Sequence, residues 1–118
     1  MVPLLAHEVS IESFRIGLEQ DPQTLVVDVR EVWELQLSRL DFPSVTNIPV
    51  GELMAQSQAE LEKLFKPQEK IVYILCHHGI RSERIARWLW SLKYKNALSV
   101  NGGIDLYARK IDPTVGFY

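Results

Sequence analysis

Two short, almost wholly apolar segments constrain the fold more than any other feature of this sequence. Segment 71–75 reads Ile-Val-Tyr-Ile-Leu, and segment 24–29 reads Thr-Leu-Val-Val-Asp-Val. Both are rich in β-branched residues and lack polar alternation, which is typical of strands that are buried on both faces. Helical patterns separate the predicted strands. The sequence therefore predicts an α/β fold in which helices cover both faces of a parallel sheet.

The other elements follow from apolar spacing and from proline, glycine and serine signals. Further strands are predicted over 6–9, 45–48 and 97–100, and a loop over 40–44. Helices are predicted from an N-cap at Ser10 to Asp21, and over 31–37, 52–65, 81–93 and 104–109. A break near Ser57 is an alternative within the helix over 52–65. We expect a single domain over 1–118.

Composition and charge exclude several classes of function. The formal net charge of −2 and the pI near 5.9 argue against a general nucleic-acid binder. No apolar run approaches the roughly 20 residues of a membrane helix. The first residues carry no basic group before their short apolar stretch, so we expect no secretory signal. With one cysteine, Cys76, no internal disulfide is available, and a reducing cytoplasm is favoured.

The loop after segment 71–75 carries the candidate chemistry. Cys76 ends the strand, and a helix is predicted to start within about five residues, so free N–H groups and the helix dipole face the thiol. Gly79 permits a tight backbone cradle, and Arg81 adds positive charge. This setting should favour a reactive thiolate and hold an anion or a bound sulfur atom. The alternative is that Cys76 is a buried apolar residue.

Four segments in this order resemble the rhodanese-like single-domain sulfurtransferases, over nearly the whole chain. They are Asp28-Val-Arg-Glu31, Asn47-Ile-Pro49, Cys76-x-x-Gly79-x-Arg81-Ser82 and Asn101-Gly-Gly103-Ile-Asp-Leu-Tyr107. The resemblance implies a five-stranded, mainly parallel sheet with helices on both faces. It also implies an enzyme that needs no cofactor.

The implied reaction has two steps. Cys76 takes the outer sulfur of a small anionic donor such as thiosulfate, and a thiol, a protein acceptor or cyanide then removes that sulfur. The resemblance assigns the backbone N–H groups of the whole loop to the persulfide sulfur. These are the N–H groups of His77, His78, Gly79, Ile80, Arg81 and Ser82.

Three features modify this expectation. The family's histidine-containing stretch is replaced by Arg39-Leu-Asp-Phe-Pro-Ser44, which predicts a changed local loop. His77 and His78 stand where dedicated thiosulfate enzymes carry basic residues, which weakens the case for thiosulfate. The segment from Gly103 onward also resembles rhodanese domains fused to enzymes that activate ubiquitin-like sulfur carriers.

Supporting roles are predicted for the polar residues near the strand ends. Asp28 and Arg30 are expected to form a fold-stabilising ion pair. Arg81 either contacts substrate or pairs with Glu31 or Asp28. A metal site at His77 and His78 is disfavoured, because neighbouring side chains diverge and only His7 and Cys76 are candidates to complete it. The two histidines are expected instead to line the pocket mouth.

On the helix over 81–93, apolar spacing divides the large side chains. Trp88 is expected in the core, and Trp90 is expected to pack against Phe117 or Tyr118. A partner surface at Trp90 is the alternative, because interfaces are enriched in tryptophan. Arg84 and Arg87 are expected to be solvated, and steering of an acidic partner is the alternative.

Other functions are weighed against sulfur transfer. The phosphatases of the related fold place five residues between cysteine and arginine, whereas four lie between Cys76 and Arg81. A non-catalytic binding module would typically lack the cysteine. A thiol-redox protein would need a second cysteine or an external thiol. We expect no metal, no nucleic acid or membrane partner, and a monomer.

Overall fold

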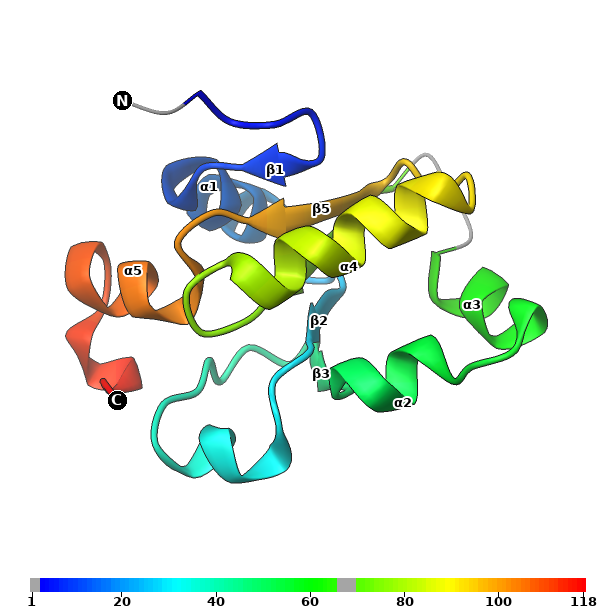
Figure 1. Ribbon diagram of the computed structural model, residues 1–118. Helices are drawn as coiled ribbons and strands as arrows, with labels where there is room; N and C mark the ends of the chain where they lie inside the picture. The colour runs from blue at the N-terminus through cyan, green and yellow to red at the C-terminus, as the bar shows by residue number, and fades with distance from the viewer. Residues whose placement is uncertain (1–2, 66–69) are drawn as a thin grey trace.

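Five parallel strands form the centre of the molecule. The computed structural model describes residues 3–65 and 70–118. The sheet order is β1-β5-β4-β2-β3, and every pairing between these strands is parallel. Figure 1 shows β1 beside β5 and β2 beside β3. The strands are β1 (Glu8–Val9), β2 (Val26–Asp28), β3 (Val45–Asn47), β4 (Val72–Leu75) and β5 (Ala97–Val100). The predicted α/β architecture is confirmed.

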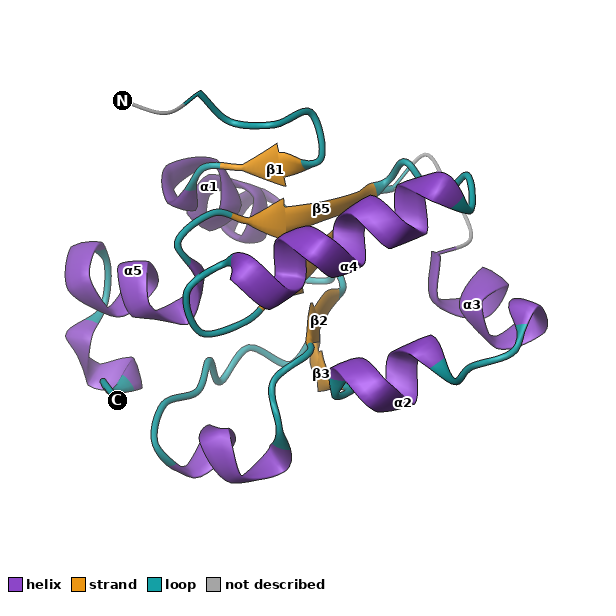
Figure 2. Ribbon diagram, viewed as in Figure 1, coloured by secondary structure: helices purple, strands orange, loops and turns teal. Residues whose placement is uncertain are grey.

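Helices cover both faces of this sheet (Figure 2). The α-helices are α1 (Ile11–Gln20), α2 (Val50–Met54), α3 (Gln58–Phe65), α4 (Ile80–Ser91) and α5 (Gly103–Lys110). Two 3-10 helices, η1 (Val32–Gln36) and η2 (Pro113–Val115), complete the fold. Within residues 3–65 and 70–118, no helix has the length and apolar character needed to cross a membrane.

The pleat of β4 divides the core into two clusters. Val72 and Ile74 face one cluster, and Tyr73 and Leu75 face the other. The first cluster adds Leu53, Leu61, Phe65, Ile85 and Leu89 from α2, α3 and α4. The second adds Ile11, Phe14, Leu18, Ile104 and Tyr107 from α1 and α5. Because both strand faces are buried, β4 shows no polar alternation in its sequence. The same two-residue period turns Cys76 toward the first cluster and α4.

The segment predicted as one helix over 52–65 consists of two helices, so the alternative of a break near Ser57 is correct. The Glu60 N–H donates to Ser57 Oγ at 3.2 Å, and the Ser57 N–H donates to Glu60 Oε1 at 2.9 Å. This reciprocal pair is a capping box, which satisfies donors at the start of α3 and separates it from α2.

Replacing Ser57 by alanine should lower the free energy of unfolding by about 1 kcal/mol, because the capping hydrogen bond from the Glu60 N–H to Ser57 Oγ is lost. Urea denaturation of Ser57→Ala measures the effect. Gln58→Ala, at the next exposed position, serves as the control and should stay within about 0.5 kcal/mol of the parent. Equal stability of the two variants would contradict a stabilising cap.

Candidate active site

The sulfur of Cys76 lies at the carboxyl end of β4, between neighbouring strands β2 and β5. This edge is where parallel α/β sheets bind ligands. The chain leaves β4, passes through four loop residues and enters α4 at Ile80. The loop therefore brings the start of α4 back over the thiol, as the sequence predicts.

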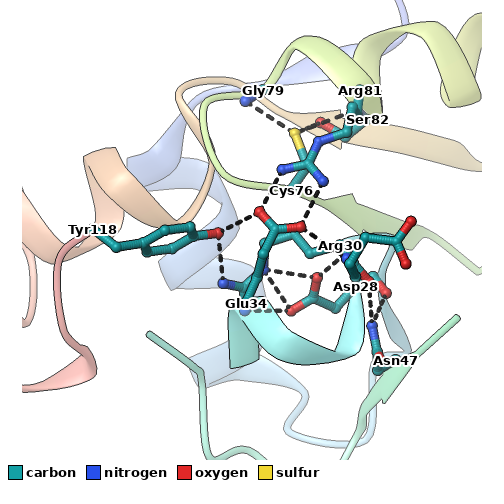
Figure 3. A network of polar contacts seen from close by, with 10 residues as sticks. Asp28, Arg30, Glu34, Asn47, Cys76, Gly79, Arg81, Ser82 and Tyr118 are labelled. Atoms are coloured by element: carbon teal, nitrogen blue, oxygen red, sulfur yellow. Dashed lines mark hydrogen bonds and ion pairs between the residues drawn. The ribbon is translucent and has the colours of Figure 1, made fainter. Parts of the chain in front are cut away.

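The thiol is held by hydrogen bonds from its own loop (Figure 3). The N–H groups of Gly79 and Ser82 donate to Cys76 Sγ at 3.1 and 3.3 Å. The thiol in turn donates to Ser82 Oγ at 3.3 Å, and that hydroxyl pairs with Ser99 Oγ at 2.8 Å. Cys76 is only 1% exposed. These contacts surround the sulfur with donors that would also stabilise a thiolate.

Further donors line the same turn. The N–H groups of His78, Ile80 and Arg81 donate to no acceptor among residues 3–65 and 70–118. Such free groups at a helix start attract an anion. The assignment of the whole run His77–Ser82 to a persulfide stays a prediction, with two of its N–H groups directed at Sγ itself.

The glycine-containing start of α5 packs against the backbone of the thiol loop and donates hydrogen bonds to it. The Ile104 N–H donates to the Cys76 carbonyl at 2.9 Å, and the Asp105 N–H donates to the His77 carbonyl at 3.0 Å. Gly103 has φ +62, and a Cβ there would lie 2.4 Å from the His77 oxygen. Only glycine allows this approach, which explains the Gly-Gly pair in physical terms.

A bidentate ion pair fixes Arg81. Its Nη1 and Nη2 donate to Glu34 Oε2 and Oε1 at 2.7 and 2.8 Å. This pairing lowers the pKa of Glu34 to about 2 and raises the pKa of Arg81. The predicted partners, Glu31 and Asp28, are wrong. Glu31 instead caps η1, which turns Glu34 inward, and Asp28 is taken by Arg30.

The predicted pair of Asp28 and Arg30 is confirmed as a buried structural contact. Arg30 Nη2 donates to Asp28 Oδ2 at 2.8 Å, and Arg30 is 0% exposed. The Asn47 side chain donates to the carbonyls of both residues at 2.9 Å. This explains two of the four motif segments: they tie β2 to β3 beside the site.

Tyr118 joins the two ion pairs (Figure 3). Its hydroxyl accepts from Arg30 Nη1 at 3.0 Å and donates to Glu34 Oε1 at 2.8 Å. Its ring stacks on His77, with centroids 3.7 Å apart. No role at the site is predicted from the sequence for Glu34, Tyr118 or Ser99. Only Glu34 carried a signal, because it follows Glu31 at capping-box spacing.

The two loop histidines stack, so the expectation that they diverge is wrong. Their ring centroids lie 3.8 Å apart with planes 23° apart. Burial, together with the neighbouring His78, lowers the pKa of His77, so its ring is neutral near pH 7. With Asp105 they place candidate ligand atoms within 4.8 Å of one another. Nearly parallel rings do not aim their in-plane lone pairs at one ion, however, and Asp105 already accepts from Arg109.

The aromatic residues of α4 divide differently from the prediction. Trp88 packs partly buried against the first cluster. The prediction for Trp90 is wrong: its Nε1 donates to the Ala97 carbonyl at 2.7 Å, and its ring meets His7 edge-on. His7 also pairs with Glu83, which removes it from the loop histidines.

The prediction that Arg84 and Arg87 of α4 are solvated is confirmed, whereas the changed loop over 39–44 stays a prediction. Arg84 is exposed, and Arg87 is exposed and pairs with Glu83. Leu40 is buried in the second cluster, whereas Phe42 is 37% exposed.

A cavity of about 610 Å³ lies at the opposite, amino end of β4, lined by Gly17 and Tyr73 among others. It is separate from the thiol.

Replacing Glu34 by glutamine should destabilise the fold by about 1 to 3 kcal/mol at neutral pH, because Arg81 and Tyr118 lose a charged partner. The folded pKa of about 2 lies below the ordinary 4.5. The carboxylate's contribution is therefore complete above about pH 4.5 and lost as pH falls toward 2. The stability difference between parent and Glu34→Gln in urea should shrink over that window. A difference independent of pH, or equally large for the exposed Glu52→Gln, would contradict this.

A methyl group at Gly103 should displace the thiol loop, because the new Cβ would strike the backbone oxygens of Cys76 and His77. We expect Gly103→Ala to lose at least about 1 kcal/mol of unfolding free energy and most of the reactivity of Cys76. Urea denaturation and thiol alkylation rates measure the two effects. Gly51→Ala is the matched control, since nothing lies within 4 Å of its Cβ position. Unchanged alkylation in Gly103→Ala would argue against a locked loop.

The comparisons with known proteins agree with this geometry. The rhodanese-like domain model matches residues 12–110. The putative sulfur carrier protein YrkF of Bacillus subtilis is 32% identical over 105 residues, covering 89% of this chain and 52% of that protein. The adenylyltransferase and sulfurtransferase uba4 of Ogataea parapolymorpha is 32% identical over 107 residues, covering 88% of this chain and 26% of that protein.

Solved structures show the same fold. The human single-domain sulfurtransferase TSTD1 has a TM-score of 0.68 and 26% identity, covering 88% of this chain and 96% of that chain. The chain spans about a quarter to a half of the length of the two curated relatives. The match over residues 12–110 and the two relatives above 30% identity show that the chain belongs to the rhodanese-like domain family.

Proposed function

We propose that this protein is a sulfurtransferase or sulfur carrier that works through a persulfide on Cys76. The observation that carries the proposal is the set of backbone donors around Sγ, from Gly79 and Ser82. The free N–H groups of the same turn would face a second sulfur atom. This cradle is built at the start of α4, where the helix dipole favours negative charge.

The chemistry requires one nucleophile and two exchanges. The Cys76 thiol first loses its proton to solvent, and the hydroxyl of Ser82 then turns to donate to the thiolate. The thiolate attacks the outer sulfur of the donor, a new S–S bond forms, and the donor's S–S bond breaks. With thiosulfate, sulfite leaves with the electron pair. An acceptor thiolate then attacks the outer persulfide sulfur and regenerates the Cys76 thiolate.

The charges at the mouth favour a persulfide donor over thiosulfate. Arg81 is paired in a bidentate contact with Glu34, and the lowered pKa of His77 leaves its ring neutral. Neither group therefore offers an uncompensated charge to a small dianion. Thiosulfate is a test-tube donor in this proposal, and a persulfide is the natural one.

The printed names of the relatives support the same class of activity. One is called a putative sulfur carrier and another a sulfurtransferase. The proposal places the protein in a reducing compartment such as the cytoplasm, because Cys76 is the single thiol and must stay available. It acts as a monomer on a thiol or protein acceptor, without cofactor.

Intact mass spectrometry tests the proposal. After incubation with glutathione persulfide, the parent should gain one sulfur atom, and cyanide or a thiol should remove it. Thiosulfate should load the protein more slowly. Cys76→Ser, checked for folding by thermal unfolding, should gain nothing. A folded parent with a titratable thiol that gains no sulfur from either donor would overturn the proposal and leave a binding module.

A further inference from the structure

The three most exposed large apolar side chains of residues 3–65 and 70–118 flank the thiol loop. Val32 is 63% exposed, Trp33 62% and Ile80 63%. Val32 and Trp33 directly precede Glu34 in the chain, and Ile80 directly precedes Arg81. The ion pair of Glu34 and Arg81 therefore brings together the two chain segments that carry these apolar residues. We call Val32, Trp33 and Ile80 the apolar rim.

The helix η1 is inverted relative to an ordinary surface helix. Its only buried residue is Glu34, whereas Val32 and Trp33 face solvent. A surface helix normally turns its apolar residues to the core. Here the inward position is taken by the carboxylate that Arg81 requires, which pushes the apolar residues out. An exposed tryptophan beside a reactive group is typical of a contact surface, because tryptophan is enriched at the centres of interfaces.

Positive charge continues from the apolar rim along α4. Arg84 and Arg87 follow Ile80 at spacings of four and seven residues, which places all three on one face of the helix. Arg84 forms no ion pair within the part of the chain that the structure describes, and Arg87 shares Glu83 with His7. Of the charged groups beside the rim, Glu31, which caps η1, is negative and Arg87 is compensated by Glu83, so Arg84 is the group that offers its positive charge to an acidic side chain of a partner.

We infer that the apolar rim and Arg84 dock a protein acceptor of the Cys76 sulfur, which has an acidic surface and presents its thiol beside apolar side chains. The inference rests on the proposed function, since it names the acceptor class of that reaction. A small thiol would leave Val32, Trp33 and Ile80 in water, whereas a protein segment would bury them. The buried position of Cys76 fits an acceptor that is held at the loop while the sulfur passes.

Synthetic peptides provide the probe. One peptide carries a cysteine between leucines, next to a run of glutamates, and a second has lysines in place of the glutamates. The parent protein is loaded with glutathione persulfide, and loss of its sulfur to each peptide, to glutathione and to cyanide is followed by intact mass. The acidic peptide should accept sulfur about tenfold faster than the lysine peptide or glutathione at equal concentration.

Variants separate docking from chemistry. Trp33→Ala and Arg84→Glu should each slow transfer to the acidic peptide about tenfold and leave the rate with cyanide unchanged. Leu92→Ala and Lys95→Glu are matched controls beyond the other end of α4, where both side chains are exposed. Both control variants should transfer sulfur to the acidic peptide at the parental rate. Transfer by Trp33→Ala and Arg84→Glu at the parental rate, or equal rates for the two peptides, would overturn the inference.

Binding is measured separately, so that a failure of the proposed function stays distinguishable. Cys76→Ser cannot carry sulfur, and a fluorescently tagged acidic peptide with serine for cysteine cannot accept it. Cys76→Ser should bind the acidic peptide more tightly than it binds the lysine peptide. Adding Trp33→Ala to Cys76→Ser should lower the affinity for the acidic peptide about tenfold. If the parent takes up no sulfur while this binding holds, the transfer proposal fails and the docking surface stands. If no such preference exists, the docking surface is disproved.

Discussion

The site depends on the bidentate contact between Glu34 and Arg81. It ties the first turn of α4, which covers the thiol, to η1, which belongs to the segment between β2 and β3. Because Glu34 is nearly buried, its charge needs partners on every side, and it has them: Arg81, the Glu31 N–H and the Tyr118 hydroxyl. Without Glu34, Arg81 would be unpaired, and the turn of α4 that donates to Cys76 would lose its anchor.

The same network explains how a buried arginine is tolerated in a small domain. Arg30 is fully buried, which would cost several kcal/mol without a partner. Its guanidinium donates hydrogen bonds to both Asp28 carboxylate oxygens and to the Tyr118 hydroxyl, and that hydroxyl donates to Glu34. The charges therefore form one chain of alternating signs from β2 to the thiol loop. This chain of contacts connects residues that are far apart in the sequence, and it leaves neither Arg30 nor Arg81 unpaired.

Sequence reasoning succeeded where the determinants are local. The apolar runs of β2 and β4, the Ser10 cap and the loop from Cys76 to Ser82 are each fixed by neighbouring residues and appear as predicted. The ion pair of Asp28 and Arg30 is also local. The wrong predictions concern side-chain partners: Arg81 pairs with Glu34, 47 residues away, Trp90 donates to the Ala97 carbonyl, and the adjacent rings of His77 and His78 stack.

Those misses have a common physical origin. A side chain's partner across the fold depends on which face of a distant element turns inward, and the sequence does not encode that directly. In η1, Glu34 is buried and Trp33 is exposed, which is the reverse of what the apolar character of these side chains alone would predict. Such local inconsistency is expected at functional sites, where stability is not the only demand on a residue.

The inversion of η1 also links electrostatics to substrate choice. Satisfying Arg81 internally stabilises the loop, but it removes the charge that would bind a small dianion. Recognition of the substrate must then come from other groups. Val32 and Trp33, which face solvent because Glu34 takes the inward position, supply that recognition. The arrangement that fixes the thiol loop thus creates an apolar contact surface at its edge. A partner too large to enter the loop can use that surface, whereas a small anion gains nothing from it.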